Sequence, residues 1–182
     1  MALKRLAING FGQVELNNVA FRRDGRIEAQ CKLDEEVFSA EVPAENGMLL
    51  AVDNIARKVT FADGEDLPIA LNYTAEHMYD ERNKGLKNFK LTPADGFYPR
   101  LGYLATGDKF TTNCVCYDDA EFTTETAFIE ALGNIATTKL YGIACEKGAI
   151  KVSATKGDAC ALVIAKTTMP DGQLGIKFQV IA

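Results

Sequence analysis

The chain has little of what most enzyme active sites need. It contains a single histidine, His77, through which any Ser–His or Cys–His mechanism would have to pass, because such nucleophiles need an adjacent base. No Gly-x-Ser-x-Gly elbow accompanies it, and we interpret His77 as an exposed or locally hydrogen-bonded side chain. A Walker-type lysine motif is absent, and Gly10-Phe11-Gly12 lacks the third glycine of a dinucleotide fingerprint. The sequence therefore predicts no catalytic and no cofactor-binding residue, and we expect the protein not to be an enzyme.

Metal-ligand motifs are also scarce. Cys114 and Cys116 lie two residues apart, so on a strand both thiols would face the same way. A closed zinc site needs four ligands, usually in paired motifs, and no second pair is present. The odd number of cysteines in a chain of this length is not typical of a disulfide framework. We expect reduced, buried thiols and no metal for all five, which are Cys31, Cys114, Cys116, Cys145 and Cys160.

Charge and hydropathy disfavour two classes of partner. The formal net charge is -5, from 20 basic and 25 acidic residues, and no basic run stands out, so we expect no binding to nucleic acid. No segment approaches the roughly 20 consecutive apolar residues that span a bilayer, so we expect no membrane insertion. The apolar stretch near the N-terminus is shorter than that of a secretory signal, and we expect synthesis and folding in a cytoplasm.

The most frequent features of the sequence are turn signals and alternating apolar residues. Pairs such as Asp24-Gly25 and Asn46-Gly47 supply the positive φ of tight reversals, and around the first pair residues 19–31 alternate as in a β-hairpin. Short runs rich in β-branched and aromatic residues follow at 48–52, 58–61, 110–117, 139–144, 149–154, 159–166 and 175–181. This rhythm predicts a mainly β fold, a sandwich or barrel of short antiparallel strands. At 182 residues we expect one β-rich domain over 1–182.

Two stretches look helical. Residues 124–132 place Phe128, Ile129 and Leu132 on one face, with Thr123 or Thr124 as N-cap and Gly133-Asn134 as the stop. Residues 74–84 are polar and suit a single helical turn. Apolar residues thin out over 79–96, which we interpret as a surface loop that could divide the chain into two subdomains. The sequence thus predicts one or two short helices.

Acidic and aromatic clusters are the remaining candidates. Three acidic clusters, at 34–36, 63–66 and 118–121, lack the spacing of a calcium loop, and we interpret them as solvated turns. The densest aromatic cluster lies at residues 97–103. It suits either the core or a contact surface, since interfaces favour tyrosine and arginine. We take Phe97, Tyr98 and Tyr103 as candidate interface residues.

One longer pattern carries a family resemblance. Residues 42–53 (VPAENGMLLAVD) form a Gly-initiated strand that ends in Val-Asp and is followed by a return strand at 58–62. Gly-Asp turns recur at Gly107-Asp108 and Gly157-Asp158. This pattern, from about Val42 to Lys166, resembles the head decoration (capsid cement) proteins of tailed phages. The resemblance implies a β-rich virion protein on the outer surface of a phage capsid, made in the host cytoplasm. Its partner would be the major capsid protein, and it would form a homo-oligomer, with a trimer favoured.

Two other classes of function stay open. One is a ligand- or carbohydrate-binding β-module, which an exposed aromatic groove would favour. The other is a small enzyme whose site is assembled from scattered carboxylates, since the separation of such a pair is a tertiary property. A pocket holding carboxyl groups with a perturbed pKa would favour this enzyme.

Overall fold

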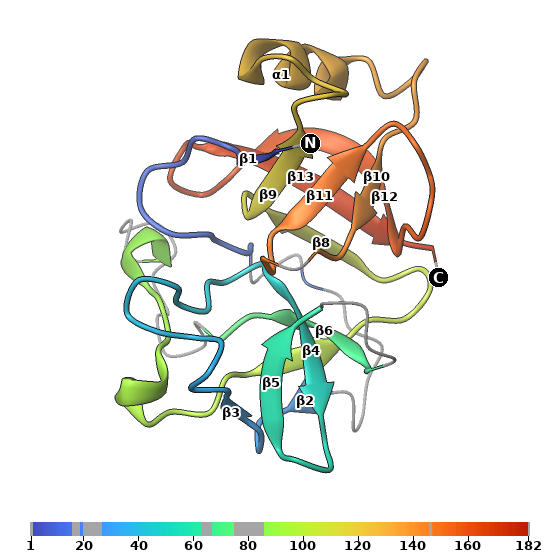
Figure 1. Cartoon of the computed structure of the whole chain (residues 1–182). Coiled ribbons are helices and arrows are strands. Elements are labelled where there is room, and N and C mark those ends of the chain that lie inside the picture. The colour runs from blue at the N-terminus through green and yellow to red at the C-terminus, as the bar shows by residue number, and fades with distance from the viewer. Residues whose placement is uncertain are drawn as a thin grey trace.

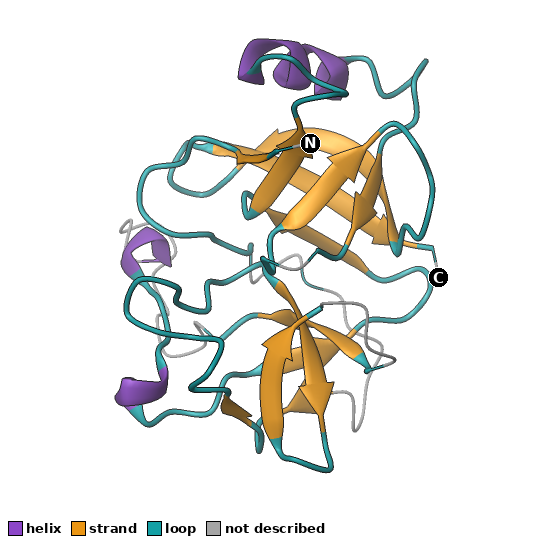
Figure 2. Ribbon diagram, viewed as in Figure 1, coloured by secondary structure: helices purple, strands orange, loops and turns teal. Residues whose placement is uncertain are grey.

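The structure, a computed structural model, describes residues 2–15, 19, 27–62, 67–74, 86–145 and 147–181. Within these residues two β-sheets make up most of the regular structure, joined by loops and accompanied by a short α-helix (Figures 1 and 2). The larger sheet lies next to this helix, and the smaller sheet occupies the other end of the molecule (Figure 1).

The larger sheet has seven strands. In spatial order they are β1 (Leu3–Arg5), β9 (Val115–Asp118), β11 (Ile150–Ser153), β10 (Tyr141–Ile143), β12 (Ala161–Thr168), β13 (Leu174–Val180) and β8 (Lys109–Thr112). All neighbours are antiparallel except β9 and β11, which run parallel.

This sheet is strongly curved. Strand β8 lies at one edge and β9 lies second from the other, although only Asn113 and Cys114 separate them in the chain. Three residue steps span at most roughly 11 Å, so the two ends of the sheet must approach each other. The prediction of one strand over 110–117 is therefore wrong. The chain breaks there because the Cys114 amide donates to Thr112 Oγ1 at 2.9 Å and the Val115 amide donates to the Asn113 carbonyl.

The smaller sheet has six strands. In spatial order they are β2 (Ile27–Glu28), β7 (Leu101–Tyr103), β6 (Ile69–Asn72), β4 (Leu49–Asp53), β5 (Lys58–Phe61) and β3 (Lys32–Leu33). Strands β4 and β5 form a hairpin in which Asp53 lies opposite Lys58, and β3 pairs in parallel with β5 at the sheet edge.

The mainly β prediction is confirmed. The described strands form two open sheets, as in a sandwich, and no closed barrel. The runs at 48–52, 58–61, 139–144, 149–154, 159–166 and 175–181 correspond to β4, β5, β10, β11, β12 and β13. Strands β1, β3, β6 and β7 were not predicted. The expected hairpin over 19–31 lies largely outside the described residues.

The helix α1 (Glu125–Gly133) matches its prediction within a residue. Thr124 is the N-cap, and its hydroxyl accepts a hydrogen bond from the Ala127 amide at 3.1 Å. Phe128 and Leu132, one turn apart, are fully buried against the larger sheet. In the described part of the chain, no helix has the length and apolar character to cross a bilayer. The second expected helix, at 74–84, lies outside the described residues except for Thr74.

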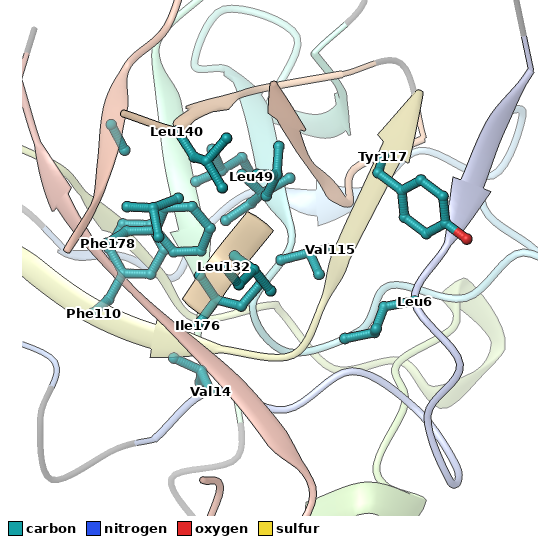
Figure 3. Packing of buried hydrophobic residues seen from close by; sticks show 14 of the residues in the cluster. Leu6, Val14, Leu49, Phe110, Val115, Tyr117, Leu132, Leu140, Ile176 and Phe178 are labelled. Atoms are coloured by element: carbon teal, nitrogen blue, oxygen red, sulfur yellow. The ribbon is translucent and has the colours of Figure 1, made fainter. Parts of the chain in front are cut away.

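Two hydrophobic clusters hold the sheets. The first fills the concave side of the larger sheet and includes the stacked rings of Phe110 and Phe178, 5.3 Å apart (Figure 3). The second combines residues of the smaller sheet with Cys116 of β9 and with Ala149, which precedes β11. Strand β4 joins them, because side chains alternate along a strand and Leu49 belongs to the first cluster while Leu50 belongs to the second.

Two further predictions concern the cysteines and the segment 79–96. The core role of the cysteines is confirmed for Cys31, Cys114, Cys116 and Cys145, which are buried in the second cluster. The loop interpretation of 79–96 is wrong for Leu91, which is 2% exposed because its side chain packs in the second cluster; its backbone pairs with Ala44 in an isolated β-bridge. Short 3-10 helices at Leu86–Asn88 and Pro93–Asp95 lie on either side of this bridge.

Candidate interaction surface

Three large apolar side chains are exposed at residues that line one groove or are the chain neighbours of residues that line it. Ile55 is 98% exposed, Phe97 71% and Tyr98 45%. Tyr98 lines the groove together with Ala56 and Arg57, so Ile55 and Phe97 are each the chain neighbour of a groove residue. We call Ile55, Phe97 and Tyr98 the apolar tip. The β4–β5 turn that carries Ile55 lies at the end of the molecule far from α1 (Figure 1).

The turn of the hairpin is held from inside by one carboxylate. Asp53 Oδ1 accepts hydrogen bonds from the amides of Ile55 and Ala56, both at 2.8 Å. Such a local bond from Asp to the backbone two or three residues on is a turn-forming interaction. Arg57 completes the reversal with φ of 57°, the left-handed conformation. The side chain of Ile55 is thereby presented to solvent by a fixed backbone.

The groove itself has a volume of about 500 Å³ and mixed charge. Its basic side chains are Lys32, Arg57 and Lys58, and its acidic ones are Asp34, Glu35 and Glu36. Edge strand β3 forms part of one wall: the Lys32 amide donates to the Arg57 carbonyl at 3.1 Å, and the Asp34 amide to the Val59 carbonyl at 3.0 Å. An ion pair of 3.2 Å between Lys58 and Asp34 crosses the same edge.

Aromatic side chains connect the groove to the rest of the smaller sheet. The Lys32 ammonium lies 5.8 Å from the centroid of the Tyr98 ring, within the range of a cation–π contact. Tyr103 is half-buried, and its hydroxyl accepts a hydrogen bond from Asn54 Nδ2 at 3.3 Å. This bond ties the hairpin turn to strand β7. Of the three candidate interface residues, Phe97 and Tyr98 are thus exposed at the surface, whereas Tyr103 is half-buried and accepts a hydrogen bond from the turn.

The acidic clusters have three different outcomes. Residues 34–36 line the groove, and residues 63–66 lie outside the described residues. In the third cluster the solvated-turn interpretation is wrong for Asp118, which is 4% exposed. Its carboxylate accepts from the Ala120 amide at 3.0 Å and from Lys151 Nζ at 3.3 Å, and these bonds hold the pKa of Asp118 below its usual range.

Outside the groove, the described residues hold no cluster of metal ligands, and Asp171 is a carboxylate with a structural role. His77 lies outside the described residues. Within the described ranges, no three His, Cys, Asp or Glu side chains are arranged to hold a metal ion. Asp171 has a lowered pKa: burial alone would raise it, but hydrogen bonds from Gln13 and Gln173 outweigh that effect. These bonds favour a charged, structural carboxylate at Asp171.

Sequence reasoning found the aromatic part of this surface and missed Ile55. The available signal was an isoleucine in the reversal between two strands, where polar residues are usual. Comparison of the chain with models of protein families, with curated proteins and with solved structures finds no match.

Proposed function

We propose that this protein is a structural virion protein that decorates the outside of a tailed-phage head. In this proposal it docks on the major capsid protein through the apolar tip. The observation that carries the proposal is the presentation of Ile55, almost fully exposed, by a turn whose backbone Asp53 fixes. An apolar side chain held in one place loses little conformational freedom on binding, which is the advantage of a preorganised contact.

The energetics of the tip suit a protein bound in many copies. Burying one large apolar side chain contributes about 1.5–3 kcal/mol. Two or three such side chains give a weak contact per copy once the cost of association is included. A homo-oligomer that engages several sites of a symmetric shell converts weak contacts into firm retention, because the later contacts form at high effective concentration. A trimer is the state we favour.

A direct test is co-sedimentation with phage heads. Purified protein is mixed with tailed-phage heads stripped of their own decoration proteins and centrifuged at micromolar concentration. We expect it to pellet with one type of head and to saturate at a fixed number of copies per capsid subunit. Retention in the supernatant with every type of head would contradict the proposal.

A second candidate is a ligand- or carbohydrate-binding module. The observation that favours it is the groove of about 500 Å³, with the Tyr98 ring and charges of both signs on its walls. Volumes of roughly 300–1,000 Å³ are typical of small-ligand sites, and an exposed ring is a platform for a sugar. Affinity electrophoresis on a panel of polysaccharides separates the two candidates. Retardation that Tyr98→Ala abolishes would favour the module, and the Phe97→Ser variant, which leaves the groove intact, is the matched control.

A further inference from the structure

Cys116 and Cys145 lie side by side in the second hydrophobic cluster, although 29 positions separate them in the chain. Cys116 is in β9, between Arg5 of β1 and Lys151 of β11. Cys145 follows β10, in a turn closed by a 2.9 Å hydrogen bond from the Gly148 amide to the Cys145 carbonyl. The two sulfur atoms are 3.8 Å apart.

This separation is close to what a disulfide requires. The bond length is about 2.05 Å, so the two sulfurs would have to approach by roughly 1.8 Å. Each sulfur is attached through one rotatable side-chain bond, and both already point toward the Ala149 carbonyl. Cys145 Sγ lies 2.8 Å from that oxygen and Cys116 Sγ 4.0 Å.

A small opening leads to one of the two thiols. A pocket of about 180 Å³ is lined by Leu3, Arg5, Cys116, Lys147 and Ala149. One water takes about 30 Å³ in the liquid, so this space admits a molecule of the size of hydrogen peroxide. Of the two lining cations, Arg5 favours the thiolate of Cys116 and partly offsets the effects that raise its pKa. Cys116 lines this opening, whereas Cys145 does not, and both thiols are largely buried.

We propose that Cys116 and Cys145 form a redox-sensitive pair that a peroxide converts into a disulfide. This inference goes beyond the proposed function and does not depend on it. In the first step Cys116 loses its proton, and its sulfur attacks one oxygen of hydrogen peroxide. An S–O bond forms, the O–O bond breaks, and hydroxide leaves. In the second step the Cys145 sulfur attacks Cys116, the S–S bond forms, and hydroxide leaves again. With the two thiol protons the products are one disulfide and two waters.

The same surroundings make the reaction slow in neutral solution. The hydrogen bond with Cys145, together with burial, raises the pKa of Cys116, and only the thiolate attacks. The oxidation should therefore accelerate as the pH rises. Cys114 is a neighbour that should not react, because it is fully buried, does not line the opening and has its pKa raised to about 12 by burial.

The disulfide would close a loop that contains α1 and β10. Closing a loop of this length restricts the unfolded chain, and the expected rise in the midpoint of thermal unfolding is on the order of 5–10 °C. The disulfide would also fix the β10–β11 connection covalently against β9, where the thiol form relies on hydrogen bonds and hydrophobic packing.

The test is oxidation of the folded chain followed by peptide mapping. Reduced protein is treated with hydrogen peroxide at pH 8, alkylated and digested. We expect one cross-linked peptide pair joining Cys116 to Cys145, a mass loss of about 2 Da, and a raised unfolding midpoint that dithiothreitol reverses. The rate should be higher at pH 9 than at pH 7. Sulfinic acid at Cys116 without a cross-link, a different pairing, or no reaction of either thiol would each overturn the proposal.

Two variants sharpen the result. In Cys145→Ser the sulfenic acid at Cys116 has no resolving partner, so a dimedone adduct should accumulate there. Cys160→Ser is the matched control, because Cys160 is half-buried and lines a different groove. In this variant the cross-link between Cys116 and Cys145 should form as in the unaltered chain. If Cys145→Ser does not fold, the mapping of the unaltered chain still decides the proposal.

Discussion

Arg5 and Glu45 form a two-point ion pair that joins the two halves of the molecule. Arg5 Nη2 lies 2.8 Å from Glu45 Oε2, and Arg5 Nη1 lies 3.4 Å from Oε1. Arg5 belongs to β1 of the larger sheet, whereas Glu45 precedes β4 of the smaller one. The Gly12 amide donates to the same Glu45 oxygen, so one carboxylate connects three segments.

We predict that Glu45→Ala lowers the free energy of unfolding by about 1–2 kcal/mol, because it leaves a partly buried guanidinium and an amide without their acceptor. Urea unfolding measures the change. Lys4→Ala is the matched control: Lys4 lies 4.0 Å from Asp119 at the surface, and its loss should cost less than about 0.5 kcal/mol. Equal effects of the two variants would contradict this account of the ion pair.

The hydrogen bonds to Asp118 predict a dependence of stability on pH. Because its pKa is lowered in the folded state, the charged carboxylate is favoured by folding. The resulting stabilisation is fully present above the unfolded pKa of about 3.9 and is lost as the pH falls through the lower folded value. We expect Asp118→Asn to be less stable than the unaltered chain at pH 7, and the difference to shrink below about pH 4. Thermal unfolding of both chains from pH 7 to pH 2 tests this. A difference in stability that stays constant with pH would exclude Asp118 as the source of the pH dependence.

Some of this structure could be predicted from the sequence because the signals are local. The helix was found because Thr124 caps it and Phe128 and Leu132 recur at helical spacing. Strands β12 and β13 were predicted because they have eight and seven residues, enough for the alternation of a strand to show in the sequence. Residues 110–117 were misread because a run rich in β-branched and aromatic residues does not reveal that the chain turns at Asn113 and Cys114 and that its halves lie at different sides of a curved sheet.

The candidate sites depended on tertiary contacts and could be predicted only in part. Phe97 and Tyr98 stood out as aromatic residues, but nothing local links them to the turn at Ile55. The groove makes that link, because β3 pairs with β5 and residues of both strands line the groove together with Tyr98 and Ala56. Cys116 and Cys145 come together only because β11 returns alongside β9.

Asp53 should control the apolar tip. In Asp53→Ala the amides of Ile55 and Ala56 lose their acceptor, and we expect the turn to loosen at a cost of about 1 kcal/mol. Hydrogen exchange of these two amides should become faster while the amides of β12 and β13 stay protected. Unchanged exchange at residues 55 and 56 would show that the carboxylate does not hold the turn.

The oligomeric state is a separate prediction. Size-exclusion chromatography with light scattering at micromolar concentration should give a mass three times that of the chain. The contact between copies should bury more than about 1,000 Å², the area that a biological interface is expected to exceed. A monomer under these conditions would remove the avidity on which the proposed function relies.

The most direct test of the proposed docking surface is the affinity of an apolar-tip variant for phage heads. Ile55→Ser combined with Phe97→Ser should weaken binding to a head that retains the unaltered chain by more than about tenfold, since each lost side chain contributes 1.5 kcal/mol or more. The variant should unfold within about 0.5 kcal/mol of the unaltered chain, because both side chains are exposed. Val42→Ser, at an exposed apolar residue that is neither in the groove nor next to a groove residue in the chain, is the control and should bind normally. Full affinity of the double variant, with saturation at the same number of copies per head, would contradict the assignment of this surface.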